Sequence, residues 1–192
     1  MRSDFTPVPE IEQTWARVTD WLNAHAPRTA ATLYRPAPPQ VIDEAQERMG
    51  TALPPELWTL LTLSGLDTPG DEYGLDGFYV NGHDYLGIHV IERWHAWRWA
   101  IQEDNPDLDP AYPFWRKEWI PIAAATSDYF FGHFLDGRTG EIGRWGHASS
   151  TDEGVYPSLA AFLGETADHM EAVSSGHADG CGAVRDGRLV WN

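Results

Sequence analysis

Cysteine is nearly absent from this sequence: Cys181 is the single one among 192 residues. One thiol cannot close an intramolecular disulfide, and so few cysteines are typical of proteins that fold in a reducing compartment. No apolar segment follows the arginine near the N-terminus, and the longest apolar runs, such as Trp119 to Ala125, are too short to cross a bilayer. The sequence therefore predicts a cytoplasmic protein without a membrane partner.

Basic side chains are also scarce. Thirteen lysines and arginines stand against twenty-nine aspartates and glutamates, which gives a formal net charge of −16. Such a chain repels the phosphates of nucleic acids and anionic lipids, so neither is an expected partner. A basic protein is a natural partner, because complementary charge speeds encounter and adds specificity. Solubility alone explains the same acidic balance equally well.

The usual motifs of catalysis and metal binding are missing. The sequence contains no GxSxG elbow, no glycine-rich phosphate cradle and no HExxH pair. His83, Asp84 and His89 are the nearest approach to a zinc site, but they straddle an expected turn and strand with no defined geometry. The sequence therefore predicts no metal and no cofactor.

Carboxylates at strand ends leave one catalytic alternative open. Asp128, Asp136 and Glu141 lie near the ends of adjacent expected strands, where they could converge as the acid and base of a hydrolase. Turn and cap roles account for such residues far more often. We therefore predict no catalytic residue and no enzyme.

Apolar residues recur at helical spacing in five segments, each with start or stop signals at its ends. Gly50 and Gly65 are expected to end their helices, and Gly65 is able to take the left-handed conformation there. The predicted helices run from Glu10 to His25, Pro39 to Gly50, Pro54 to Gly65, Val90 to Asp104 and Pro157 to Val173.

Short apolar segments between turn residues predict the strands. Residues 78–80 and 86–88 flank a turn, and residues 119–124, 129–136 and 141–145 follow as an antiparallel meander. Residues 174–192 either add a short edge strand or trail from the fold. Together these elements predict an α+β fold in which helices surround a mostly antiparallel sheet.

Ten tryptophans are an unusual number for this length. Trp94 and Trp97 lie on the apolar stripe of their helix, so both are expected in the core, whereas Trp99 falls off it. Trp99 and Trp115 flank an acidic connection. They either belong to an exposed aromatic and acidic surface that anchors a protein partner, or form a hydrophobic cluster under a loop.

The order of three segments resembles the SUKH superfamily. They are VIDEAQERMG, then LPPELWTLLTLSG, then WIPIAAATSDYFFGHFLDGRTGEIG, and the resemblance covers about residues 38–173. Ser64 and residues 126–128 depart from the family pattern. The matching positions are Leu53, Pro54, Gly65, Trp119, Pro121, Ile122, Asp136 and Gly140.

This resemblance implies one domain over residues 1–192, with a mixed sheet in a core at about 38–173, the helix at 10–25 packed on it and 174–192 as an extension. It further implies binding to another protein without any reaction. The superfamily is rich in bacterial immunity proteins that neutralise a cognate toxin, often a nuclease or a deaminase. It also includes a yeast regulator of cell-wall synthesis, so a regulatory or scaffold role is the alternative.

The predicted protein-binding residues follow from charge and loop placement. Acidic side chains would contact a basic partner, and one aromatic ring would anchor it. These residues are Asp67, Asp71, Glu72, Asp104, Asp107, Asp109 and Trp115.

Overall fold

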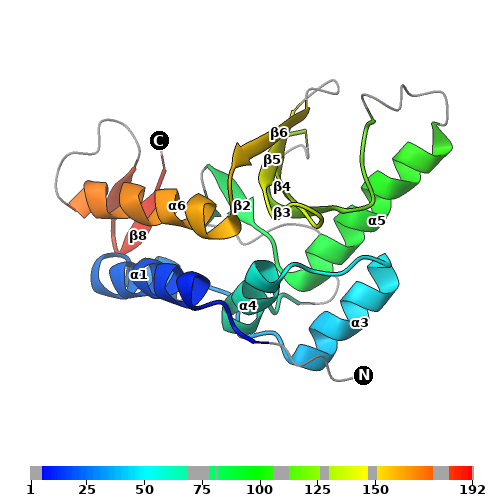
Figure 1. The fold of residues 1–192 in the computed structure, drawn as a ribbon. Helices are drawn as coiled ribbons and strands as arrows, with labels where there is room; N and C mark the ends of the chain where they lie inside the picture. The colour runs from blue at the N-terminus through cyan, green and yellow to red at the C-terminus, as the bar shows by residue number, and fades with distance from the viewer. Residues whose placement is uncertain are drawn as a thin grey trace.

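The computed structural model describes residues 6–68, 78–80, 82–105, 113–125, 130–146, 151–174 and 182–191. Figure 1 shows the arrangement of its helices and strands. The helices are α1 (Pro9–His25), α2 (Pro27–Ala30), α3 (Pro39–Met49), α4 (Pro55–Ser64), α5 (Ile88–Asp104) and α6 (Leu159–Ser174). The strands are β1 (Tyr79–Val80), β2 (His83–Tyr85), β3 (Trp119–Ala124), β4 (Gly132–Asp136), β5 (Ile142–Trp145), β6 (Thr151–Tyr156), β7 (Ala183–Arg185) and β8 (Arg188–Val190).

The first six strands form one sheet in the order of the chain. Every neighbouring pair is antiparallel, so the predicted meander and the α+β class are confirmed, and the pairs between described strands include no parallel one. All residues of β3 and β4 are buried, which places these two strands at the centre of the core. The sheet is therefore the frame on which the helices are arranged.

Helices cover both faces of the sheet. Figure 1 shows α5 on one side of it, with α6 and α1 on the other. On the α5 side, the ring of Phe134 stacks on that of Trp119 at 4.4 Å. The preceding residue of β4, His133, points the opposite way, and its ring lies 4.9 Å from that of Phe162 in α6. The alternation of side chains along β4 thus binds one strand to both helical layers.

The two ends of the chain pack against each other. Helix α1 lies along α6, where the indole Nε1 of Trp21 donates to Ser174 Oγ at 2.8 Å. Strands β7 and β8 form a separate two-stranded sheet, which residues of α2 hold in place. The backbone N–H of Leu189 donates to Thr29 Oγ1 at 2.9 Å. The described part of the C-terminal extension, residues 182–191, is therefore a hairpin packed on the N-terminal helices, and not an added edge strand of the six-stranded sheet.

One strand was predicted in the wrong place. The strand that follows the turn is His83–Tyr85, whereas Leu86 and Gly87 are irregular and Ile88 already begins α5. The apolar triplet 86–88 resembled a strand because its residues are buried. These residues are buried because they connect β2 to α5 inside the core. At this connection, Leu86 donates its backbone N–H to the carbonyl of Ile122 in the neighbouring β3.

Gly65 is required at the end of α4 for a different reason from the predicted one. Its φ of −143° is not left-handed. A Cβ at this position would lie 2.6 Å from the Cα of Leu61, so the lack of a side chain permits a close approach of backbone. Gly50, by contrast, ends α3 with a φ of 63°, as expected.

The edge strand β6 was not predicted, and it is irregular. Ile142 pairs with Tyr156 and Arg144 with Asp152, so three residues of β6 stand opposite one residue of β5. Gly154 sits within this bulge with a φ of 66°. Bulges of this kind twist an exposed edge and disfavour pairing with another sheet.

Among the described residues, no helix combines the length and the apolar character needed to cross a membrane.

The buried side chain of His133 makes the free energy of unfolding depend on pH. Its side chain is buried, and Nδ1 has no hydrogen-bond partner among the described residues. Burial, with smaller contributions from His83 and Arg144, lowers the pKa of His133 to about 3. The unfolded chain keeps a histidine pKa of about 6.5, so it binds the proton first and stability falls as pH drops below that value. Between pH 7 and pH 5, we expect this one group to remove about 2 kcal/mol.

Urea unfolding at both pH values, compared between the wild type and His133→Phe, measures this contribution. The phenylalanine variant should lose less stability on acidification than the wild type. Equal losses in the two proteins would show that His133 does not stay neutral in the fold.

Candidate protein-binding surface

Helix α5 exposes one large aromatic side chain. The buried positions of the helix include Ile91, Trp94, His95 and Arg98, whereas Trp97 is 50% exposed. The prediction for Trp94 is confirmed, but the placement of Trp97 in the core is wrong. The buried stripe continues through two polar residues, His95 and Arg98, and an apolar pattern cannot detect such positions.

Arg98 explains why α5 lies on the sheet in this orientation. Its guanidinium carbon lies 4.1 Å from the ring centre of Trp145 and 4.7 Å from that of Trp115. The ring centres of Phe114 and Trp97 lie farther from it, at 5.7 and 5.8 Å. Burial lowers the pKa of Arg98 to about 9, so the group is still charged at neutral pH. A planar cation over aromatic faces gains cation–π attraction, which favours this arrangement.

Trp115, a predicted anchor for a partner, belongs to the core. It is 1% exposed, and its ring meets the rings of Trp119 and Trp145 edge to face at 5.5 Å. Its backbone N–H donates to Gln102 Oε1 of α5 at 3.0 Å. The structure therefore selects the buried aromatic cluster over the exposed surface for this residue, and Trp115 cannot touch a docked partner.

Asp67 is buried as well, and it positions the start of α5. Its Oδ1 accepts the backbone N–H of His89 and its Oδ2 that of Val90, both at 2.9 Å. These two donors would otherwise be unsatisfied at the helix N-terminus. A Cβ on Gly87 would lie 2.5 Å from this carboxyl group, so the glycine admits Asp67 to its place.

The three predicted binding residues that the structure describes, Asp67, Asp104 and Trp115, do not form one site. Asp67 lies at the N-terminus of α5 and Asp104 at its end, which separates them by roughly 24 Å at 1.5 Å per residue. Only Asp104 is exposed. The other predicted residues, Asp71, Glu72, Asp107 and Asp109, lie outside the described residues.

A different group of residues is gathered on the outer side of α5. We call it the α5 surface, and it consists of Trp97, Ala100, Ile101, Glu103 and Asp104. Trp97, Ile101 and Asp104 follow one another at helical spacing, so they share a face. Arg98 contacts the Trp97 ring from below. An exposed tryptophan on a rigid helix, beside acidic residues, is suited to anchor a basic protein.

The described residues give no support to the alternative of a hydrolase that uses strand-end carboxylates. Asp136 Oδ1 accepts the backbone N–H groups of Arg138 and Thr139 at 2.8 and 3.4 Å, which is the turn role expected of it. Glu141 is exposed, and Asp128 lies outside the described residues. Within the described part of the chain, no three histidine, cysteine, aspartate or glutamate side chains are placed to hold a metal ion.

The family model of the SMI1 / KNR4 family (SUKH-1) matches residues 36–165. This range contains α3, α4, α5 and the entire six-stranded sheet, and it leaves out α1, α2 and the β7–β8 hairpin. No curated protein matches the chain.

Two predicted site residues with different surroundings provide a test of this geometry. Asp67→Ala removes the acceptor of two buried backbone N–H groups, so we expect a loss of about 2 kcal/mol or more in the free energy of unfolding. Asp104→Ala removes an exposed carboxylate from the C-terminal end of α5, where the helix dipole disfavours negative charge. The free energy of unfolding of this variant should stay within about 0.5 kcal/mol of the wild-type value. Urea denaturation followed by circular dichroism compares the two variants. Similar losses would contradict the capping role of Asp67.

Proposed function

The chain belongs to the SMI1 / KNR4 family (SUKH-1), and from this membership we propose that it is a protein-binding protein without catalytic activity. Its partner is a cognate toxin that it neutralises in the cytoplasm. The observation that carries the site of binding is the α5 surface, where Trp97 is half exposed beside the acidic end of the helix. Family members of this kind act by covering another protein, and no reaction is needed for that.

Charge supports a basic partner. The net charge of −16 complements a protein that grips phosphates, such as a nuclease or a nucleic-acid deaminase. Glu103 and Asp104 are exposed in the last turn of α5, next to Trp97 along the helix. Apolar contact at the tryptophan would provide most of the affinity, while the carboxylates would speed encounter and set the dependence on salt.

A regulator or scaffold of the cell-wall-synthesis type is the second candidate, and it would use the same kind of surface with a partner that is not toxic. The identity of the partner separates the two functions. Co-expression separates the two functions directly. Cells that express a toxin alone stop growing, whereas cells that express the toxin together with this chain grow.

Truncation of the anchor should abolish capture of the partner. In pull-downs from a lysate of the source cells, wild type and Phe131→Ala should retain one stoichiometric basic protein that Trp97→Ala loses. Phe131 is the matched control, since its ring is 45% exposed on another part of the surface. With the purified partner, Trp97→Ala should weaken binding by about 2 kcal/mol, or roughly 30-fold in Kd. Binding of Trp97→Ala equal to wild type would remove α5 from the interface.

A further inference from the structure

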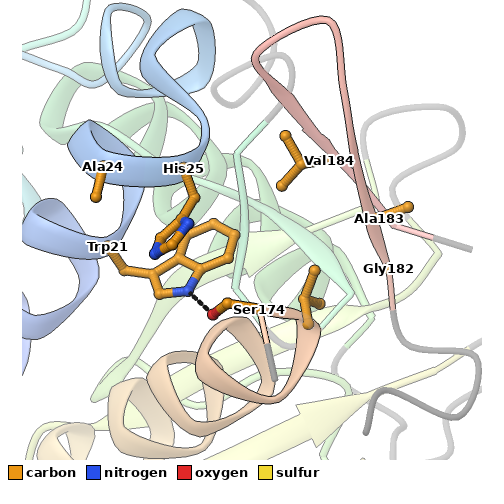
Figure 2. Close-up of a pocket in the computed structure, with 8 residues that line it drawn as sticks. Trp21, Ala24, His25, Ser174, Gly182, Ala183 and Val184 are labelled. Atoms are coloured by element: carbon orange, nitrogen blue, oxygen red, sulfur yellow. Dashed lines mark hydrogen bonds between the residues drawn. The ribbon is translucent and has the colours of Figure 1, made fainter. Parts of the chain in front are cut away.

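A cavity of about 550 Å³ opens where the two ends of the chain meet. Figure 2 shows it between the last turn of α1, the end of α6 and strand β7. Its lining residues all fall outside the range 36–165 that matches the family. The volume is within the usual range of binding pockets. This cavity therefore lies outside the part of the chain that matches the family.

The cavity is suited to an apolar side chain. The ring of Trp21 lies against that of His25, with their centres 4.9 Å apart, and its Nε1 donates to Ser174 Oγ, as the dashed line in Figure 2 marks. Val173 and Val184 also line the cavity, and Val184 is 37% exposed. Because the indole N–H already has its acceptor, apolar contact is what this part of the cavity offers a ligand.

Positive charge gathers at the turn end of the β7–β8 hairpin. Arg185 and Arg188 stand directly opposite each other across the β7–β8 hairpin, whose turn consists of Asp186 and Gly187 with positive φ. Arg28 of α2 joins them: its backbone N–H donates to the carbonyl of Gly187 at 2.8 Å and its Nη1 to that of Asp186 at 3.4 Å. We call Arg28, Arg185 and Arg188 the cationic tip. Like charges directly opposite in a hairpin are destabilising.

Five arginines in the described part of the chain have carboxylate partners, whereas those of the cationic tip have none there. Arg17, Arg48, Arg116, Arg138 and Arg144 each form an ion pair. Among the described residues, no aspartate or glutamate pairs with Arg28, Arg185 or Arg188. In a chain of net charge −16, this is an exposed group of cations whose natural complement is a carboxylate from outside.

The outer edges of the hairpin also present backbone groups that could pair with an added strand. Strands β7 and β8 pair only with each other in the described structure, so each has one edge without a neighbouring strand. A two-stranded sheet of three-residue strands is marginal by itself and gains stability from an added segment.

We propose that the cavity and the cationic tip form one docking site for an extended segment of a partner protein that carries apolar residues beside acidic ones. Val184 lines the cavity, and the next residue, Arg185, extends from the opposite face of β7, so an extended segment reaches both halves of the site by passing over the outer edge of this strand. The apolar side chain enters between Trp21 and Val184, and the carboxylates meet the guanidinium groups. This site goes beyond the proposed function, because its charge preference is opposite to that of the α5 surface.

Labelled peptides test the site on the full chain. One probe has three leucines followed by three glutamates, and a second has the reverse order. The two controls replace leucine by serine or glutamate by lysine. Fluorescence anisotropy should show saturable binding of at least one leucine–glutamate peptide, with both controls at least 10-fold weaker. Absence of saturable binding by both leucine–glutamate peptides, or equal binding of the controls, would overturn the proposal.

Matched variants locate the binding. Arg185→Glu with Arg188→Glu should weaken it at least 10-fold, whereas the equally charged pair Arg35→Glu and Arg138→Glu, both on exposed arginines elsewhere, should change it less than threefold. Val184→Ser should weaken it about fivefold, and Val190→Ser, equally exposed on the same hairpin but outside the cavity, should not. Circular dichroism confirms that each variant is folded.

Two outcomes separate this site from the α5 surface. Trp97→Ala should bind the peptide with the same affinity as wild type. The peptide test therefore remains valid even if the α5 surface proves not to bind a partner. Equal effects of the two arginine pairs, or of the two valine variants, would show that the peptide is held elsewhere by general charge or apolar contact.

Discussion

The burial of Arg98 among aromatic rings constrains how the rest of the molecule is arranged. A guanidinium that is 4% exposed has lost most of its hydration, and the faces of Trp115 and Trp145 replace part of it. These rings come from the segment before β3 and from β5, so one side chain joins the helix to two parts of the sheet region. With this contact made, α5 can rotate little about its axis, and Trp97 is the aromatic residue left facing outward. The exposure of Trp97 is thus a consequence of the buried cation.

Local patterns were enough to predict most of the elements but few of the functional positions. The helices that become α1, α3, α4 and α6 and the meander of β3 to β5 follow from spacing and turn residues within short windows. The start of α5 does not, because Asp67 caps it from more than twenty positions earlier in the chain. Arg98 and His95 were missed because a polar residue in a buried stripe carries no apolar signal. Trp97 was then assigned to the core by the same pattern.

The predicted acidic site illustrates a second limit of prediction from sequence alone. Composition shows that acidic residues are abundant, yet their role depends on contacts across the fold. Asp67 satisfies backbone donors inside the protein, whereas Asp104 faces outward, and nothing in their local sequence distinguishes the two. The cationic tip could have been suspected from the two arginines that flank Asp186 and Gly187, since an Asp-Gly turn places its flanking residues opposite each other. The approach of Arg28 to that turn is a tertiary contact that no local pattern reveals.

The packing of α1 on α6 has a consequence for how the protein is made. Helix α1, whose buried residues include Trp15, Val18 and Leu22, packs along a helix that begins at Leu159. At roughly 5 to 20 residues per second, the ribosome needs about 10 to 30 seconds to extend the chain from one helix to the other. During that interval the apolar stripe of α1 has α4 to pack on but not α6. The nascent chain therefore carries an incompletely covered amphipathic helix through most of its synthesis, which is the kind of segment that chaperones at the ribosome recognise.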